Sequence, residues 1–380
     1  MKWRLTLIGI AAGLALAGCG GGDPTTSAVR VVGDSLSDSG TFGLKFTVQN
    51  TPAFQIWTDV VTQGVDAPAL CPRYALPVGV ISSVPVLNPA ATDCTSYGVG
   101  GGRINPSGSA ADSTPVSIVQ QLQDAGSRAY ARDELLLANG GGNDIADLVG
   151  AYLALSSDGG TAYTTLLSEL LTAQQVSDAV AGGADGLAAA GGTYMVALAN
   201  RFADALTTHA LNRGAQRVVV QTAPDVTRTP RFTAVLAGVA LAAGGGTTGE
   251  AVANQVRTLA NAWVTAFNNQ LRARLNGVSG VAIVDFYTEL NGWLDNPSAF
   301  GLTNTTTPAC PITGTDPQGL PSYSIATCTA DLLSANPPTG VTDPAWWETY
   351  VFSDNFHGTP RTNELMGELT LRVIRDRGWD

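Results

Sequence analysis

Two short polar segments, one near each end of the chain, contain residue types that together can activate a hydroxyl group for attack on a carbonyl carbon. Near the start, the apolar run 28–32 leads into Gly33-Asp34-Ser35-Leu36, and near the end the sequence reads Asp354-Asn355-Phe356-His357. A serine hydroxyl is a weak nucleophile until a base accepts its proton, and that base is usually a histidine oriented by a carboxylate. We therefore predict a catalytic set of Ser35, His357 and Asp354.

The chain has only two histidines, and their contexts differ. His209 lies within the helical pattern 200–213, which predicts a place on a helix surface near the carboxyl end. His357 follows Asp354 by three residues, a spacing that brings two side chains together in a turn, so the carboxylate could fix the tautomer of the imidazole. We interpret His357 as the base. The alternative is a solvated loop histidine beside a capping aspartate.

Short apolar runs alternate with helical patterns along the chain. The candidate strands are 29–32, 134–138, 217–221 and 281–286, and the candidate helices are 115–126, 161–178, 181–212, 248–276 and 360–377. This alternation predicts an α/β fold, a three-layer αβα sandwich on a parallel sheet of about five strands. Ligands bind such sheets at the carboxyl edge, where the first strand would deliver Ser35. We expect residues 28–380 to form one domain with loop insertions.

The first 18 residues have the features of a bacterial export signal. Two basic residues precede the apolar stretch 5–16, which is too short to span a bilayer, and a small-residue site ending in Cys19 follows. This arrangement resembles a bacterial lipoprotein signal. The resemblance implies removal of residues 1–18, lipidation of Cys19, a flexible tether over 19–27 and anchoring in the outer membrane of a Gram-negative bacterium. An ordinary secretory signal, which would make the protein periplasmic or secreted, is the alternative.

The charge of the chain argues against a nucleic-acid partner. The formal net charge is −11, and removal of residues 1–18 takes away Lys2 and Arg4 and changes it to −13. Lys45 is then the only lysine, and the arginines are scattered along the sequence. No basic surface for a phosphate backbone is predicted. The expected partners are an ester substrate and, through the lipid anchor, a membrane; the sequence does not predict an oligomeric state.

Four cysteines remain when Cys19 is set aside as the lipid site, and an exported chain meets an oxidising compartment. Among the three possible connectivities we favour Cys71 with Cys94 and Cys310 with Cys328. Each pair would close a short loop within one irregular, proline-rich segment, at about 65–95 or 295–345. Metal binding is the competing interpretation, but neither C-x-x-C nor H-E-x-x-H occurs, so no metal site is predicted.

Four blocks in order along the chain resemble the GDSL, or SGNH, hydrolase family. They are Gly33-Asp34-Ser35-Leu36, Ser96-Tyr97-Gly98-Val99-Gly100-Gly101-Gly102-Arg103, Gly141-Gly142-Asn143-Asp144 and Asp354-Asn355-Phe356-His357. No G-x-S-x-G occurs, which argues against an α/β-hydrolase nucleophile elbow. Segments 221–230 and 300–304 also look like the bacterial branch described as lecithinase-like or phospholipase-like. The resemblance spans about residues 29–377.

The resemblance implies an oxyanion hole made by the backbone N–H of Ser35, a glycine N–H and the side chain of Asn143. Three consecutive glycines blur the register, so Gly101 is our assignment and Gly100 the alternative. The glycine block begins with Ser96 where the family usually has asparagine, which puts the local hydrogen bonding in question. No metal or organic cofactor is required for this chemistry.

Several other residues near these blocks invite a functional interpretation. Asp34 and Asp38 are expected to bond local backbone in the turn after the first strand, and Asp225 to fix a loop. We also formulate the hypothesis that Trp346 and Trp347 wall an acyl pocket, although tryptophans more often pack in a core or a lid.

The sequence thus predicts a carboxylic ester hydrolase that acts through a serine acyl-enzyme on lipid or on short to medium acyl esters. A carbohydrate O-acetylesterase would use the same groups around a small polar pocket. A surface lipoprotein that binds glycans or lipids on an inactive hydrolase scaffold is the alternative outside the enzyme class, and the intact set of Ser, Gly, Asn and His disfavours it.

Overall fold

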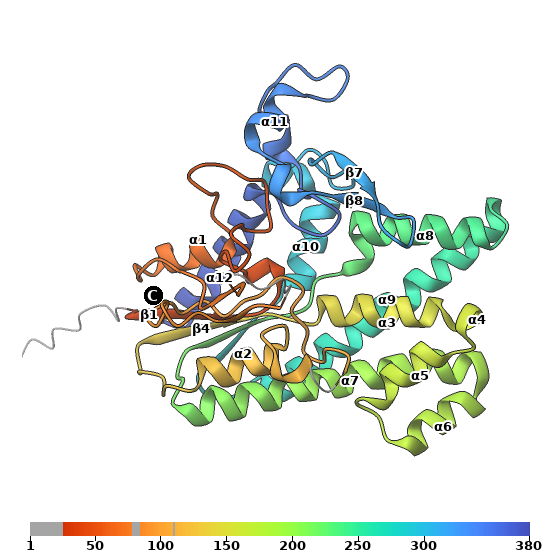
Figure 1. Cartoon of the computed structure of the whole chain (residues 1–380), viewed down its shortest axis with the longest axis horizontal. Coiled ribbons are helices and arrows are strands. Elements are labelled where there is room, and N and C mark those ends of the chain that lie inside the picture. Colours follow the sequence, from red (N-terminus) through yellow and green to blue (C-terminus); the bar gives the residue numbers. More distant parts are fainter. Residues whose placement is uncertain (1–25, 78–83, 109–110) are drawn as a thin grey trace, which may run out of the picture.

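The computed structural model of the chain describes residues 26–77, 84–108 and 111–380 (Figure 1). At its centre lies a parallel sheet in the order β1-β4-β5-β6. These strands are Ala28–Val32, Glu134–Ala138, Val218–Gln221 and Val281–Val284, so all four apolar runs form the strands expected of them. The sheet has four strands in the described residues rather than about five. Segment 95–97 runs beside the outer edge of β1, but it pairs there through a single parallel bridge between Val31 and Ser96.

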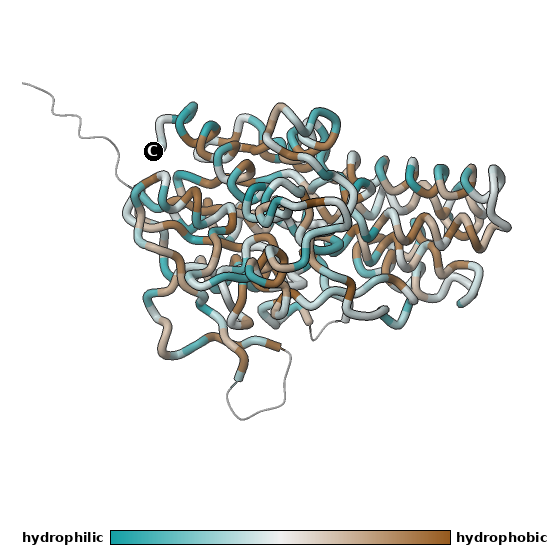
Figure 2. Tube along the Cα trace, turned by 90° about the horizontal axis from the view of Figure 1, so that it is seen from above, coloured by the Kyte–Doolittle hydropathy of each residue, from teal (hydrophilic) through white to brown (hydrophobic). Residues whose placement is uncertain are grey.

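Side chains of the strands alternate between two buried faces. In β4, Leu136 and Ala138 join a core cluster with helices on one side of the sheet, whereas Leu135 and Leu137 join a second cluster with helices on the other side. Helices therefore cover both faces of the sheet, and the predicted three-layer αβα sandwich is confirmed. In Figure 2 hydrophilic residues follow the outer edges of the helices while hydrophobic residues gather between them.

Most of the long helices agree with the helical patterns. The helices are α1 (Trp57–Gly64), α2 (Ile118–Ala125), α3 (Gly142–Leu153), α4 (Leu155–Asp158), α5 (Thr161–Ser168), α6 (Ala173–Ala181), α7 (Gly183–His209), α8 (Pro230–Ala242), α9 (Gly246–Leu275), α10 (Phe286–Asp295), α11 (Ala330–Ala335) and α12 (Pro360–Asp376). The single helix expected over 161–178 is two, because Thr172 starts a new helix with a capping box to Gln175. Helices α1, α3, α4, α8, α10 and α11 lie outside the predicted helical ranges.

Both predicted disulfides form, Cys71–Cys94 and Cys310–Cys328. The first closes a loop with the short ladder of β2 (Tyr74–Ala75) and β3 (Val86–Leu87), and the second closes a loop with the hairpin of β7 (Ile312–Thr315) and β8 (Pro321–Tyr323). In Figure 1 the second segment lies beyond the sheet, with the hairpin reaching toward α8. These irregular segments are thus fixed by cross-links and by short ladders.

A buried ion pair joins the first two strands of the sheet. Arg30 of β1 is 2% exposed, and its guanidinium donates to the Glu134 carboxylate at 2.6 Å and to carbonyl oxygens of Ala125, Arg128 and Ala129 at the end of α2. The Tyr130 ring lies 4.0 Å from the guanidinium carbon. The partners of this buried cation therefore come from α2, from β4 and from the loop that joins them.

Removal of Glu134 should destabilise the fold, because it leaves the Arg30 charge buried without its counter-ion. We expect Glu134→Ala to lower the free energy of unfolding by about 3–5 kcal/mol in urea titrations with the disulfides intact. Arg128→Ala is the control: its side chain is 64% exposed and also contacts Glu134, so its loss should cost at most about 1 kcal/mol. Equal effects of the two substitutions would contradict the prediction.

Candidate active site

Ser35 lies at the carboxyl edge of the sheet, in the turn that follows β1. A short 3-10 helix, Ser35–Ser37, begins there, and the Asp34 carboxylate caps it by accepting the Leu36 N–H at 3.0 Å. The Gly33 N–H donates to the side chain of Gln121 at 2.7 Å, which ties the turn to α2. These bonds fix the turn, and Ser35 itself is only half-buried, so a substrate can reach its hydroxyl.

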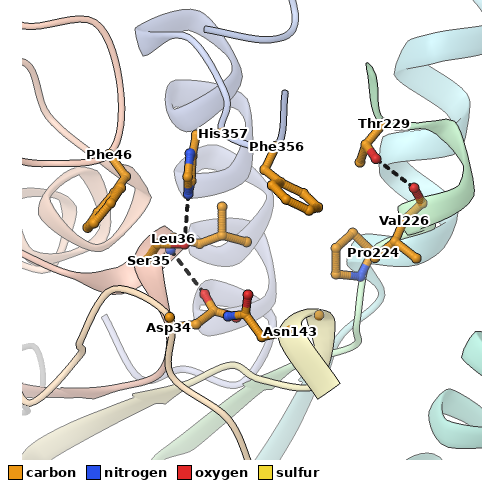
Figure 3. Close-up of a pocket in the computed structure, with 12 residues that line it drawn as sticks. Asp34, Ser35, Leu36, Phe46, Asn143, Pro224, Val226, Thr229, Phe356 and His357 are labelled. Carbon is orange, nitrogen blue, oxygen red and sulfur yellow. Dashed lines mark hydrogen bonds between the residues drawn. The ribbon is translucent and has the colours of Figure 1, made fainter. Parts of the chain in front are cut away.

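His357 and Asp354 lie in the turn before α12, and the fold brings them to Ser35 across 322 positions of sequence. The Asp354 carboxylate accepts the backbone N–H groups of Phe356 and His357 at 2.8 and 2.7 Å through one oxygen. Its other oxygen lies 2.7 Å from His357 Nδ1, and His357 Nε2 lies 2.8 Å from Ser35 Oγ (Figure 3). With the ring proton on Nδ1, facing the carboxylate, Nε2 is free to accept the serine proton.

Burial and charge act in opposite directions on this pair. Burial alone lowers the pKa of the His357 imidazole, but the charge of Asp354 and the hydrogen bond to it outweigh burial, so the pKa lies above its usual 6.5. Burial alone raises the pKa of Asp354, but His357 and the two backbone N–H groups hold it below the usual 3.8. Asp354 therefore stays ionised as an orienting partner at neutral pH.

Thr95 and the first residues of the glycine block, Ser96 and Tyr97, run along the outer edge of β1. Val31 N–H donates to the Thr95 carbonyl at 3.0 Å, and Tyr97 N–H donates to the Val31 carbonyl at 2.7 Å. The Ser96 hydroxyl, at the position where the sequence departs from the family pattern, is buried without a hydrogen-bond partner among the described residues. The backbone thus holds this segment beside Ser35 without help from that side chain.

The three glycines of the block differ in what their N–H groups do. Gly100 N–H donates to the Asp38 carboxylate at 2.8 Å, and Gly102 N–H donates to the Val99 carbonyl at 2.9 Å. Gly101 adopts a left-handed backbone with φ of 77°, and its N–H has no acceptor within the described part of the chain. Gly101 lines the cavity of about 180 Å³ beside Ser35.

Asn143 reaches the same cavity from α3. The helix begins after Gly141, whose φ is 98°, and Asn143 is its second residue. The amide of Asn143 donates to the Gly102 carbonyl at 2.9 Å, so the helix and the glycine block are held together. Ser35, Gly101, Asn143 and His357 all line one cavity, and Asp354 contacts His357, so the structure brings together the residues predicted for the triad and the oxyanion hole.

The three other aspartates make the local bonds expected of them. Asp34 accepts from Leu36 N–H, Asp38 accepts from the N–H groups of Gly40 and Thr41, and Asp225 accepts from Thr227 N–H. The second histidine, His209, ends α7 as predicted and lies outside the cavity.

The hypothesis that Trp346 and Trp347 wall the acyl pocket is wrong. Both are buried in a separate cluster with the Cys310–Cys328 disulfide, and their indole N–H groups donate to the Leu333 carbonyl and the Ser334 hydroxyl. Their proximity in sequence to Asp354 does not bring them to the cavity beside Ser35. They support the disulfide-closed segment instead.

The apolar walls of the cavity come from residues to which the sequence assigned no role. Phe46 lies with its ring centre 5.0 Å from that of His357, and Leu36, Pro224, Val226 and Phe356 complete the lining (Figure 3). Pro224 and Val226 belong to the segment 221–230, which carried a resemblance but no assigned role. Phe46 belongs to no motif, and only the course of its loop brings it to the cavity.

The described residues contain no group of three or more His, Cys, Asp or Glu side chains placed to hold a metal ion. None of the helices in the described ranges is long and apolar enough to cross a membrane.

The strand-edge serine, the glycine and asparagine blocks and the C-terminal acid and histidine define a hydrolase of the α/β sandwich class. Residues 29–370 match the family of GDSL-like Lipase/Acylhydrolase, and the chain belongs to that family. This membership identifies an ester hydrolase. No curated protein matches the chain.

The two histidines should titrate on opposite sides of pH 6.5. Burial and the charge of Arg213 lower the pKa of His209, whereas Asp354 raises that of His357. In Asp354→Asn the larger raising charge is lost, and burial outweighs the smaller raising charge of Asp34 that remains, so the pKa of His357 should fall below 6.5 while that of His209 stays unchanged. NMR titration of the two imidazoles measures both values, and an unshifted His357 in the variant would refute the account.

Proposed function

We propose that Ser35, His357 and Asp354 form the catalytic triad of a carboxylic ester hydrolase that acts through an acyl-enzyme. The observation that carries the proposal is the continuous chain of contacts from Ser35 Oγ to His357 Nε2 at 2.8 Å and from His357 Nδ1 to Asp354 at 2.7 Å. It supplies a nucleophile, a base within hydrogen-bond reach and a group that orients the base.

The reaction proceeds in two halves. Ser35 Oγ attacks the ester carbonyl while His357 Nε2 accepts its proton, and the imidazolium is stabilised by Asp354. The bond to the alcohol then breaks, and the leaving oxygen takes the proton from Nε2. Water enters, gives a proton to His357 and attacks the acyl-serine, which releases the acid and restores the Ser35 hydroxyl.

The negative charge on the carbonyl oxygen is stabilised by N–H groups of Ser35, Gly101 and Asn143. Gly101 is preferred over Gly100 because the Gly100 N–H is already engaged by Asp38 at 2.8 Å, whereas the Gly101 N–H has no acceptor among the described residues. The Asn143 amide can exchange its bond to the Gly102 carbonyl for one to the oxyanion.

The substrate class follows from the lining of the cavity. Leu36, Phe46, Pro224, Val226 and Phe356 make its walls apolar, which favours lipid or acyl esters over the small polar pocket of a carbohydrate O-acetylesterase. This preference also agrees with the lecithinase-like or phospholipase-like branch that the sequence resembles. The ordered triad argues against an inactive binding scaffold.

The proposal extends to the place of the enzyme in the cell. Residues 1–25, which include the signal sequence and Cys19, lie outside the described residues. We propose that residues 28–380 form one exported domain, tethered through residues 19–27 to a lipidated Cys19 in the outer membrane. The lipoprotein-type cleavage site ending in Cys19 and the two disulfides support this location.

Removal of single groups should separate the roles within the site. Ser35→Ala and His357→Ala should each lower kcat for p-nitrophenyl esters by at least about 10⁴-fold without unfolding the protein. Asn143→Ala removes one oxyanion donor and should lower kcat by about 10² to 10³. His209→Ala is the matched histidine control and should leave kcat unchanged. Near-normal turnover by Ser35→Ala would exclude the triad.

Lipidation of Cys19 can be tested in a bacterium that processes lipoproteins. The full chain should take up an alkyne-labelled fatty acid and sediment with the membrane fraction, whereas Cys19→Ser should lose the label because it lacks the thiol that carries the lipid. A wild-type protein that is exported without label would instead establish an ordinary secretory signal.

A further inference from the structure

A second cavity, of about 460 Å³, extends the catalytic one between helices α3 and α8. Asn143, Val226, Thr229 and Phe356 line both cavities, so the second opens directly from the site of the carbonyl group. Figure 3 shows Val226 and Thr229 on the side of the site opposite Phe46. We refer to this second cavity as the α3–α8 groove.

The walls of the α3–α8 groove are mainly apolar and come from one face of each helix. On α3 they are Ala146, Asp147, Val149, Gly150 and Leu153, and on α8 they include Phe232, Val235, Gly238 and Val239. Residues at these spacings share one side of a helix. Three charged side chains also line the groove, and each has an ion-pair partner: Arg103 pairs with Asp147, and Arg231 pairs with Asp316. The groove therefore follows the helices away from Asn143 with mainly apolar walls, and its charged side chains are neutralised in pairs.

The two glycines keep the groove wide. A Cβ atom built on Gly150 or on Gly238 would meet no atom within 4 Å, and neither residue has a positive φ. Glycine inside a helix is less favourable than alanine, and nothing in the packing of either helix requires it at these positions. Both glycines are exposed and line the groove, so a larger side chain at either position would extend into space that the groove now leaves open.

The hairpin of β7 and β8 contributes the remaining wall. Gln318 and Leu320 at its turn line the groove, and Asp316 forms an ion pair of 3.0 Å with Arg231 at the start of α8. The Leu320 N–H donates to the Asp316 carboxylate at 2.9 Å, so the turn is held in one shape. The disulfide-closed segment thus contacts the substrate path through this hairpin rather than through its tryptophans.

We propose that the α3–α8 groove binds the hydrocarbon chain on the acyl side of the substrate, an inference that rests on the proposed function. The leaving alcohol must lie beside His357 Nε2, from which it takes its proton, and His357 lines the catalytic cavity but not the groove, which opens beside Asn143 and Phe356. From Asn143 to Leu153 the helix rises about 15 Å, the extended length of roughly 10 to 12 carbons. The enzyme would then prefer esters of unbranched fatty acids of medium length.

The test is the ratio of kcat/KM for p-nitrophenyl decanoate to that for p-nitrophenyl acetate. Each methylene removed from apolar contact costs about fourfold. Gly150→Leu and Gly238→Leu fill the groove, so each should lower the ratio at least tenfold. Gly292→Leu is the matched control, since Gly292 is an exposed glycine inside α10 whose Cβ would also meet no atom within 4 Å, and it should keep the wild-type ratio. If the leucine variants fail to fold, the double variant Gly150→Ala/Gly238→Ala should still lower the ratio severalfold.

The possible results separate this inference from the proposed function. An unchanged ratio in groove variants that remain active would overturn the groove alone. Chain-length effects that appear only with alkyl acetates, in which the alcohol is lengthened, would overturn the assignment to the acyl side. Absence of Ser35-dependent hydrolysis in the wild-type protein would overturn the proposed function and this inference with it.

Discussion

The side chain of Asn139 joins the ends of two neighbouring strands, and the geometry of the site depends on it. It accepts the Ser37 hydroxyl at 2.5 Å and donates to the Asp34 carboxylate at 2.9 Å, so the turn after β4 is bonded to the turn after β1. The contact is so close that a Cβ atom on Gly33 would lie 1.8 Å from the Asn139 oxygen. Glycine is therefore required at position 33 for a steric reason, and Ser35 and the start of α3 are held at one separation.

Two buried carboxylates near His357 show how environment divides their roles. Burial raises the pKa of Asp34, and its hydrogen bonds from Asn139 and Leu36 only partly offset this. Asp354 is equally enclosed, but the charge of His357 and hydrogen bonds from the imidazole and two backbone N–H groups lower its pKa. A carboxylate that keeps its charge can stabilise an imidazolium, whereas one that is costly to ionise serves better as a fixed link between turns. The difference between the two carboxylates follows from the charge and the hydrogen bonds around each of them.

The parts of this enzyme that could be predicted from sequence are those whose signals are local. The four strands are short apolar runs, and the triad and oxyanion residues lie in blocks that follow strands or turns. The pocket walls had no such signal: Phe46 is placed by the course of a long loop, and Trp347 lies near Asp354 in sequence but packs on the Cys310–Cys328 disulfide. The number of strands was overestimated by one, because segment 95–97 forms only one bridge to β1 and does not continue as a strand.

In the proposed function, helix α3 links the chemistry of the site to its selectivity. Its second residue, Asn143, reaches the catalytic cavity, and its later residues, including Gly150, line the groove that leads away. Because a helix is rigid over three turns, a carbonyl group held by Asn143 sets where a chain must lie along the remainder of α3. Selection by the groove can thus be changed by substitutions far along the helix without moving the oxyanion donor. A loop in the same place would couple the two properties, since any change in its shape would also displace the donor.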